Sequence, residues 1–353
     1  MICCENCFKD LEIKDIIKHA NNKGRCSICL SDDVYIYNTD EDSIIEEMFN
    51  EILDIYYLES ELDENYPEER LNLLKEELYS NWNIFNIKPD KISILIKEIC
   101  KTKYDENSRL FRNSIGIKQF FDKSYLINNS IMKIYTWDKF VDEIKTQCRF
   151  HNDFFYKDVF SGYFKYMNKL YKKGELFYRA RVSEERGFSK NEMGAPPLGK
   201  ATGGRANPMG ISYLYLASDS KTAVSEIRAS ALDYITVAKF ELLKDIKIID
   251  FEKIDKISPF FDDMDITKLG INNKILKVIS EEISKPLGGN GRALEYLPTQ
   301  YISDYIKSIG EWQGIKYKST LGDGYNLAIF DEKLFKCKSI EVKRINKLNY
   351  SYL

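Results

Sequence analysis

The spacing of apolar residues changes about halfway along the chain. From residue 42 to about residue 171, apolar residues recur every three or four positions, which is the period of an amphipathic helix. Pro67 stands at the start of one of these stretches, where proline favours a helix start. Strand signals are nearly absent, so we expect long helices joined by short loops, as in a helical bundle. The helical stretches are 43–62, 67–82, 91–101, 111–126, 136–149 and 153–172.

Beyond residue 172 the pattern becomes mixed. Short runs rich in β-branched and aromatic residues indicate strands, and loops rich in glycine and proline separate them. Stretches of helical period interrupt the strands at 219–232, 271–284 and 299–310. We therefore expect an α+β region, whose loops are the natural places for functional residues. The expected strands are 170–182, 211–217, 234–242, 246–251, 314–317, 325–330 and 338–345.

The composition is that of a globular protein with two or three domains. The chain has 353 residues, of which 44% are hydrophobic and 30% are charged. No apolar run approaches the roughly 18 residues that a membrane span needs. The N-terminus lacks the basic segment and apolar core of a signal peptide. We expect a cytoplasmic protein that does not bind membranes.

Charge is distributed unevenly along the chain. The first 80 residues carry 21 acidic and 7 basic side chains, a balance of −14, whereas the whole chain has a net charge of −3. The remainder therefore carries +11. Blocks of like charge are usually solvated faces; alternatively, the acidic part lies against the basic part and tempers it. The basic residues are too dispersed to indicate nucleic-acid binding.

Five of the eight cysteines lie near the N-terminus. Cys4 and Cys7 form one Cys-x-x-Cys pair, and Cys26 and Cys29 form a second. Two such pairs are typical of a tetrahedral Zn²⁺ site, because each pair directs two sulfurs toward the ion. Cys3 could replace Cys4 as a ligand. Four thiolates leave no position for a catalytic water, so we expect the zinc to be structural.

Several common catalytic patterns are missing from the sequence. The chain has only two histidines, His19 and His151, and neither follows an arginine at the spacing that HEPN-type ribonucleases use. Neither histidine lies in the second half, so no Ser-His-Asp triad is available there. The Gly-Gly-Asn-Gly-Arg sequence at 288–292 lacks the preceding strand that a dinucleotide-binding motif needs. The helical region is therefore expected to be structural or sensory.

Five polar residues of the second half are candidates for function. Arg179 is expected at the end of a strand, Arg205 lies in a Gly-Gly-Arg-Ala-Asn loop, and Ser319 follows another strand. Arginine suits bidentate contact with phosphate. Glu226 lies on a helix among small and apolar neighbours, and Tyr215 faces the side of its strand opposite to two leucines. Taken singly, these signals are weak, because an ordinary surface or core residue also explains each of them.

Taken together, these residues resemble the signature of the RES domain family, which is named for its Arg, Glu and Ser. The order is Gly-Arg-x-Asn, then Tyr-Leu-Ala, then Glu, and finally Tyr-x-Ser before Gly-x-Asn-Leu-Ala-Ile-Phe. The three name-giving residues correspond here to Arg205, Glu226 and Ser319. Tyr215 corresponds to the strand tyrosine of the family. The resemblance covers about 172–345, roughly half of the chain.

Further segments extend this resemblance, with one departure. Leu-Phe-Tyr-Arg-Ala-Arg is similar to the opening strand of the family, which makes Arg179 a second phosphate-binding arginine. The segment 297–319 is similar to the one before the family's serine. Lys318 stands where the family commonly has proline, which predicts a looser loop around the serine. The N-terminal half resembles the zinc-knuckle and helical extension that accompanies some RES domains.

The resemblance implies a fold and an activity. RES domains are similar in fold to ADP-ribosylating toxins, and members degrade NAD⁺ by phosphorolysis or hydrolysis, or transfer ADP-ribose. Many act as bacterial toxins held in check by an antitoxin, and related chains serve in phage defence. The implied organisation is a zinc-knuckle module at 1–40, a helical bundle at 41–171 and a RES catalytic domain at 172–353. Structural Zn²⁺ and NAD⁺ as substrate follow from it.

The resemblance also implies roles for the candidate residues. Cleavage of the nicotinamide–ribose bond passes through a cation-like transition state, so it needs a nearby anion and rigid positioning more than a strong base. Glu226 would hold the ribose hydroxyls and stabilise that cation. Arg179 and Arg205 would bind the pyrophosphate or an attacking inorganic phosphate. Tyr215 would pack on the substrate or hydrogen-bond to it, and Ser319 would orient the ribose or the nucleophile.

Two other functions stay open at this point. An ADP-ribosyltransferase would use the same pocket but would need an exposed rim for its protein target. A non-catalytic module would bind a partner through the zinc knuckle and helices, although the intact Arg, Tyr, Glu and Ser favour an enzyme. We also expect the N-terminal half to regulate the RES half. A regulatory partner or antitoxin, and assembly as a homo-oligomer, are compatible with the sequence.

Overall fold

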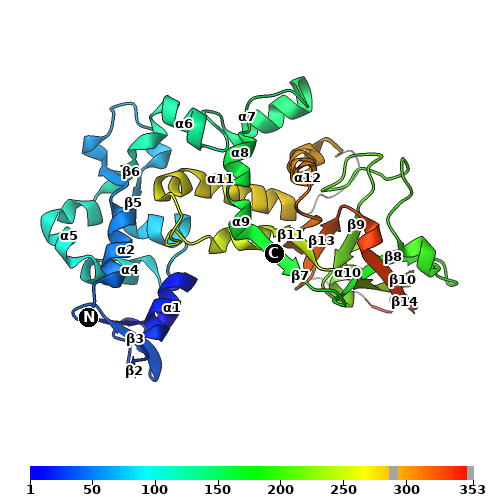
Figure 1. Cartoon of the computed structure of the whole chain (residues 1–353), viewed down its shortest axis with the longest axis horizontal. Coiled ribbons are helices and arrows are strands. Elements are labelled where there is room, and N and C mark those ends of the chain that lie inside the picture. Colours follow the sequence, from blue (N-terminus) through cyan, green and yellow to red (C-terminus); the bar gives the residue numbers. More distant parts are fainter. Residues whose placement is uncertain (286–292, 348–353) are drawn as a thin grey trace. The chain divides into compact units, whose positions relative to one another are not determined.

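The computed structural model describes residues 1–285 and 293–347, so the sequence at 288–292 lies outside the described residues. The chain divides into two compact units, each made of separate stretches of sequence (Figure 1). Unit 1 comprises Met1–Thr136, Phe154–Val159 and Asp255–Leu276. Unit 2 comprises Trp137–Asp153, Phe160–Ile254 and Lys277–Leu353.

Unit 1 takes residues from both halves of the sequence. The segment 255–276 of the second half packs with the N-terminal residues in unit 1. The rings of Phe49 and Phe260 meet edge-on, with centroids 5.4 Å apart. The backbone N–H of Ile131 donates to Oδ1 of Asn272 at 2.7 Å. Unit 1 is therefore completed by residues that lie far along the chain.

Unit 1 combines helices with two three-stranded sheets, ordered β1-β3-β2 and β4-β6-β5. The second of these sheets corrects the expectation of an almost purely helical region after residue 42. Tyr56 and Leu58 are buried on β4, whereas Tyr57 between them is exposed, which is the alternation of a strand. Such a short apolar run also fits the helical period, so spacing alone does not separate the two structures. The elements are β1 (Ile2–Cys4), α1 (Leu11–His19), β2 (Lys23–Gly24), β3 (Val34–Asn38), α2 (Ile44–Leu53), β4 (Tyr56–Leu58), β5 (Asn72–Leu73), α3 (Leu74–Glu76), α4 (Pro89–Ile99), α5 (Lys101–Glu106), β6 (Ser114–Ile117) and α6 (Lys123–Asn129).

Unit 2 is built around an eight-stranded sheet in its described part, ordered β14-β10-β8-β9-β13-β12-β11-β7. The pairs are antiparallel except β11 with β12. Buried Phe177, Leu216, Phe240 and Leu327 belong to one core cluster of this sheet, as the alternation of their strands predicts. The elements are α7 (Trp137–Asp142), α9 (Phe164–Met167), β7 (Asn168–Tyr171), β8 (Leu176–Ser183), β9 (Leu214–Ala217), α10 (Ser220–Glu226), β10 (Tyr234–Leu242), β11 (Ile246–Asp250), α12 (Leu297–Ile309), β12 (Gly314–Lys318), β13 (Tyr325–Ile329) and β14 (Phe335–Arg344).

Two further helices, α8 (Lys157–Ser161) and α11 (Ile266–Ser284), contribute residues to both units. The mixture of helices and sheets confirms the expected α+β class. Helix α10 packs against β8 and β9, and it is shorter than the expected 219–232. Arg228 and Leu232 have φ values of +49° and +73°, which no right-handed helix accommodates. The helix therefore ends at Glu226, one of the candidate site residues.

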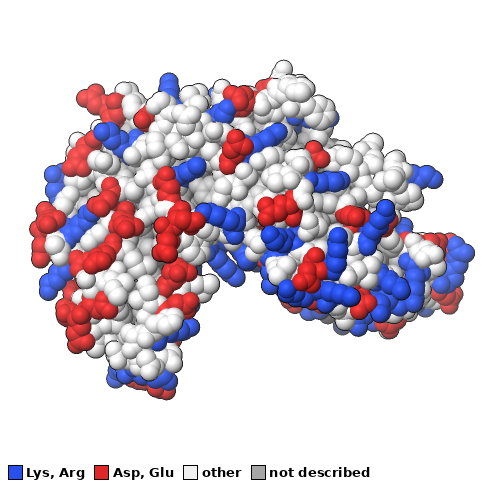
Figure 2. Space-filling model, in the orientation of Figure 1, with Lys and Arg blue, Asp and Glu red and all other residues white. Residues whose placement is uncertain are grey.

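The surface of each unit reflects the charge pattern of the sequence. On the face shown in Figure 2, Asp and Glu side chains gather over α2, α4 and α5 of unit 1. Lys and Arg side chains are dense over the β10 and β14 end of unit 2 on the same face. Among the helices of the described residues, none is long and apolar enough to cross a membrane.

Candidate functional site

A cavity of about 250 Å³ opens in unit 2 where β8, β9, β12, β13 and α10 meet. Three of the five candidate residues line it, namely Arg179, Tyr215 and Glu226. Each comes from a different element, so the cavity exists only in the folded sheet. The complete lining is Tyr178, Arg179, Ala180, Tyr215, Leu216, Ala217, Ala223, Glu226, Ile227, Tyr317 and Asn326.

Glu226 is fixed by two hydrogen bonds to one of its carboxylate oxygens. Ser319 donates from Oγ to Oε1 at 2.6 Å, and Asn326 donates from Nδ2 to the same oxygen at 2.7 Å. Within the described ranges, no hydrogen bond is made to Oε2 of Glu226. The carboxylate is therefore held in place while one of its oxygens remains available to a ligand in the cavity.

Ser319 itself is almost completely buried, with 2% of its surface exposed. Its backbone N–H donates to the carbonyl of Gly324 at 3.1 Å, which closes the turn between β12 and β13. Lys318, the departure from the family pattern, pairs with Tyr325 in the ladder of these two strands. The ladder and the turn constrain the serine, so the loop that lysine predicts to be looser is held by backbone hydrogen bonds.

Tyr215 connects the cavity to the glycine-rich loop before β9. Its hydroxyl donates to Oδ1 of Asn207 at 2.7 Å and accepts from the backbone N–H of Ala206 at 3.0 Å. Burial raises the pKa of Tyr215 to about 12, so the phenol stays neutral at physiological pH. Gln300 on α12 donates to the carbonyls of Gly204 and Asn207, at 2.7 and 3.1 Å. The loop that carries Arg205 is thus fastened on both sides.

Arg179 is one of the lining residues, and its cation is incompletely bonded. It lies in the middle of β8, not at a strand end as expected, because the strand continues to Ser183 in register with β10. Its Nη1 donates to the carbonyl of Tyr215 at 3.3 Å, and its buried Nε has no hydrogen-bond partner within the described residues. Burial, together with nearby Arg181, lowers the pKa of Arg179 to about 10, which still leaves it charged at neutral pH. An anionic ligand would satisfy this cation.

Arg205 lies outside the cavity lining. Its Nη1 donates to the carbonyls of Ile283 and Ser284, both at 2.8 Å, at the C-terminal end of α11. A cation is favourable at that end of a helix. Its guanidinium carbon lies 5.2 Å from the centroid of the Tyr317 ring, and Tyr317 lines the cavity. Arg205 is therefore linked to the cavity through Tyr317.

The structure places at the site four residues to which the sequence alone assigns no function. Asn207 and Asn326 belong to the Gly-Arg-x-Asn and Gly-x-Asn segments of the family signature. Asn207 accepts a hydrogen bond from Tyr215, and Asn326 donates one to Glu226. The other two are aromatic residues on strands, whose type and period are equally those of core residues. They are Tyr178 and Tyr317, which both line the cavity.

The N-terminal cysteines form a separate cluster in unit 1. The sulfur atoms of Cys4, Cys7, Cys26 and Cys29 all lie within 4.8 Å of one another, and the closest pairs are 3.4 to 3.8 Å apart. In a tetrahedral site with Zn–S bonds of about 2.3 Å, sulfurs are about 3.8 Å apart. The backbone N–H groups of Ile28 and Cys29 donate to Sγ of Cys26, each at 3.4 Å. These residues therefore fit a structural zinc ion.

Cys3 is directed away from this cluster. It is paired with Tyr37 in the β1–β3 ladder, and side chains alternate along a strand, so Cys3 and Cys4 face opposite sides. Cys3 is fully buried, and that burial raises the pKa of its thiol to about 12. The choice between Cys3 and Cys4 that the sequence leaves open is thus decided in favour of Cys4 as the residue that joins the cluster.

Comparison with known proteins identifies a family that the sequence matches. The family model described as RES domain matches residues 176–352, half of the chain. No curated protein matches the sequence. Among solved structures, a chain of the crystal structure of the M. tuberculosis MbcT–MbcA toxin–antitoxin complex is similar at 12% identity, with a TM-score of 0.29. The match covers 49% of this chain and 86% of that chain.

Proposed function

The chain belongs to the RES domain family, and we propose that it is an enzyme that degrades NAD⁺ by cleaving the bond between nicotinamide and ribose. The observation that carries this proposal is the pair of opposite charges on the cavity. Glu226 offers a free carboxylate oxygen, and Arg179 offers a buried N–H without a partner. NAD⁺ supplies a partner for each: the developing ribosyl cation for the carboxylate of Glu226, and the pyrophosphate for the cation of Arg179.

The chemistry requires little more than these groups. Nicotinamide leaves as a neutral molecule, and positive charge then develops on the ribose, where a fixed carboxylate stabilises it. Glu226 is held by Ser319 and Asn326, so it needs no rearrangement as that charge forms. A cavity of about 250 Å³ is smaller than most pockets for whole ligands, which hold roughly 300–1,000 Å³. We propose that the nicotinamide riboside half enters it with the pyrophosphate next to Arg179, and that the adenosine half lies outside.

Arg179 is our candidate for the anion-binding group, with Arg205 supporting the cavity through Tyr317. Arg179 would bind either the pyrophosphate of NAD⁺ or an inorganic phosphate that replaces nicotinamide. Phosphorolysis and hydrolysis differ only in the nucleophile that reaches the ribosyl cation. Both outcomes therefore use the same cavity and the same carboxylate.

The test is incubation of the full-length protein with NAD⁺, with and without inorganic phosphate, followed by measurement of released nicotinamide. We expect nicotinamide release in at least one condition, and a phosphorylated ADP-ribose product if phosphate is the nucleophile. Transfer of ADP-ribose to added proteins would instead identify an ADP-ribosyltransferase. Absence of NAD⁺ consumption in all conditions would refute the proposal.

We further propose a structural Zn²⁺ ion held by the cysteine cluster and a regulatory partner of the antitoxin type. The ion would fix the fold of the knuckle and would take no part in the reaction, because four sulfur ligands complete its coordination. The partner follows from the family, whose members commonly act as toxins, and an enzyme that depletes NAD⁺ has to be restrained in its own cell.

A further inference from the structure

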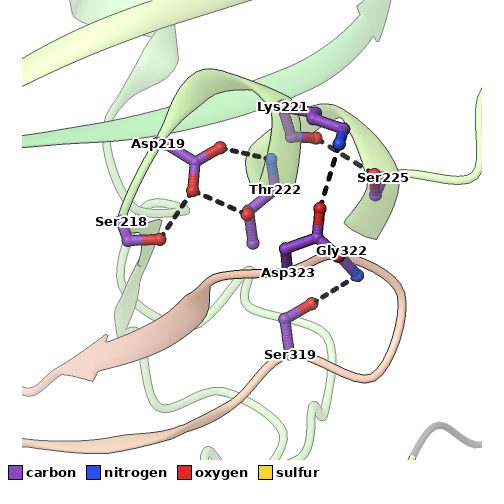
Figure 3. A network of polar contacts seen from close by, with 8 residues as sticks. All are labelled: Ser218, Asp219, Lys221, Thr222, Ser225, Ser319, Gly322 and Asp323. Atoms are coloured by element: carbon purple, nitrogen blue, oxygen red, sulfur yellow. Dashed lines mark hydrogen bonds and ion pairs between the residues drawn. The ribbon is translucent and has the colours of Figure 1, made fainter.

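The turn that carries Ser319 is seated on the first turn of α10. Asp219 caps this helix, with Oδ1 accepting from the N–H of Thr222 at 2.8 Å. Its other oxygen accepts from the hydroxyls of Ser218 and Thr222, at 2.8 and 2.7 Å (Figure 3). Burial opposes the ionisation of Asp219, but the hydrogen bonds from Thr222 and Ser218 outweigh it and keep its pKa below the usual value. The polar face of this helix end is therefore rigid.

Two glycines let the turn approach that face closely. A Cβ added to Gly324 would lie 2.6 Å from both Oδ2 of Asp219 and Oγ1 of Thr222, and would collide with the hydroxyl of Ser218. A Cβ added to Gly322 would lie 3.2 Å from Cα of Thr222. The Ser218 hydroxyl cannot simply rotate away, because it also accepts from the N–H of Tyr325 at 3.2 Å. The turn and the helix end fit only while residue 324 has no side chain.

This seating determines where the hydrogen of the Ser319 hydroxyl points. The oxygen accepts from the N–H group of Gly322 at 3.0 Å (Figure 3) and from the N–H group of Leu321 at 3.3 Å. A hydroxyl has one hydrogen and two lone pairs. With both lone pairs engaged, the hydrogen is left for Oε1 of Glu226 at 2.6 Å. Ser319 is therefore oriented as a donor to the carboxylate, which lies at the other end of the same helix.

We propose that Asp219 and Gly324 are positioning residues, which hold Ser319 so that Glu226 is in its reactive orientation before the substrate binds. Helix α10 is braced at both ends by one turn: its first turn receives Gly324, and its last residue receives the hydroxyl of Ser319. The effect on catalysis rests on the proposed NAD⁺-cleaving function. The exposed ion pair between Lys221 and Asp323, at 3.0 Å, lies beside this contact and adds little to it.

The kinetic test is a double-mutant cycle on the full-length protein. Gly324→Ala is expected to lower kcat about tenfold or more and to leave KM within about threefold, which corresponds to a loss of about 1.4 kcal/mol or more in the transition state. Asp219→Asn keeps the helix cap but cannot accept both hydroxyls, and it should lower kcat less. In a Ser319→Ala background, Gly324→Ala should have almost no further effect. Lys221→Ala is the matched control and should keep full activity.

A second measurement does not depend on NAD⁺. Amide hydrogen exchange of Leu321 and Gly322 should accelerate in Gly324→Ala and in Ser319→Ala, and stay unchanged in Lys221→Ala. If the wild type does not consume NAD⁺, the proposed function fails, and hydrogen exchange alone decides the positioning. An equal loss of kcat from Gly324→Ala in both backgrounds, or unchanged exchange in Gly324→Ala, would overturn the inference.

Discussion

The cysteine cluster of unit 1 and the cavity of unit 2 use their polar groups in opposite ways. In the cluster, four identical ligands converge within 4.8 Å, and one tetrahedral ion would use all of them. Among the residues that line the cavity, two groups of opposite charge each have an atom without a hydrogen-bond partner in the described structure. These atoms are Nε of Arg179 and Oε2 of Glu226. A metal site whose ligands are all used stabilises the fold, whereas a cavity with unpaired polar atoms can bind a ligand. Stability and activity should therefore respond separately to substitutions at the two places.

Loss of Cys4, a proposed metal ligand, should have the largest effect, and it should be on stability. Binding of structural zinc contributes roughly 10 kcal/mol or more to the folding of small zinc modules. We expect Cys4→Ser to lose the metal and to lower the free energy of unfolding of unit 1 by several kcal/mol. Elemental analysis and thermal unfolding measure both effects. Cys3→Ser is the matched control and should keep about one zinc per chain; the reverse pattern would contradict the assignment of Cys4.

Glu226→Gln should produce the largest effect on activity with little change in stability. The amide oxygen of glutamine still accepts from Ser319 and Asn326, so the fold is retained, but the charge that stabilises the ribosyl cation is gone. We expect kcat/KM for NAD⁺ to fall about 100- to 1,000-fold, or about 3–4 kcal/mol. Glu281→Gln, on an exposed position of α11, is the control. Full turnover by Glu226→Gln would remove Glu226 from its role.

Arg179→Gln should act mainly on substrate binding. The cation is expected to contact a phosphate group in the ground state and in the transition state alike, so its loss raises KM. We expect an increase of about 10- to 30-fold in KM with a smaller change in kcat. The neighbouring Arg181→Gln is the matched control, because Arg181 donates to the carbonyl of Glu192 and does not line the cavity. Equal kinetic effects of the two variants would argue against a specific role for Arg179.

Ionisation of Tyr215 should have the smallest effect, which is on the pH dependence of the free energy of unfolding. Its folded pKa of about 12 lies above the unfolded value near 10, so the stability it provides is complete below pH 10 and is lost as the pH rises through 12. Between pH 8 and pH 11 this loss amounts to about 1.4 kcal/mol. Denaturant unfolding at these pH values should show a shallower decline for Tyr215→Phe. An identical decline would show that the phenol does not ionise differently in the two states.

The cysteine cluster could be predicted from the sequence because its geometry is local. Cys-x-x-Cys fixes the separation of two sulfurs within a single turn, whatever the rest of the chain does. Only the choice between Cys3 and Cys4 needed the structure, since it depends on the alternation of β1. The strands of unit 2 could likewise be predicted from local sequence, because short runs rich in β-branched and aromatic residues stand between loops rich in glycine and proline.

The geometry of the cavity could not be predicted in the same way. Whether Arg205 reaches the cavity depends on where α11 ends, since the carbonyls of Ile283 and Ser284 engage it. The partners of Glu226 come from residues about 100 positions away in sequence. The sheet formed by β4, β5 and β6 was missed because runs of two to four residues do not distinguish the helical period from the strand period. Long-range packing decides all three.

Because unit 1 is discontinuous in sequence, it also determines the order in which the two units can fold during translation. Unit 1 is complete only when Leu276 has been added, and domains generally fold as units while synthesis proceeds. Ser319 and Asn326 emerge later still, and Glu226 has neither of its partners before then. A nascent chain thus holds every residue of unit 1 before it can form the bonded carboxylate. For an enzyme that consumes NAD⁺, translation itself would delay activity until the last strands of the sheet have been made.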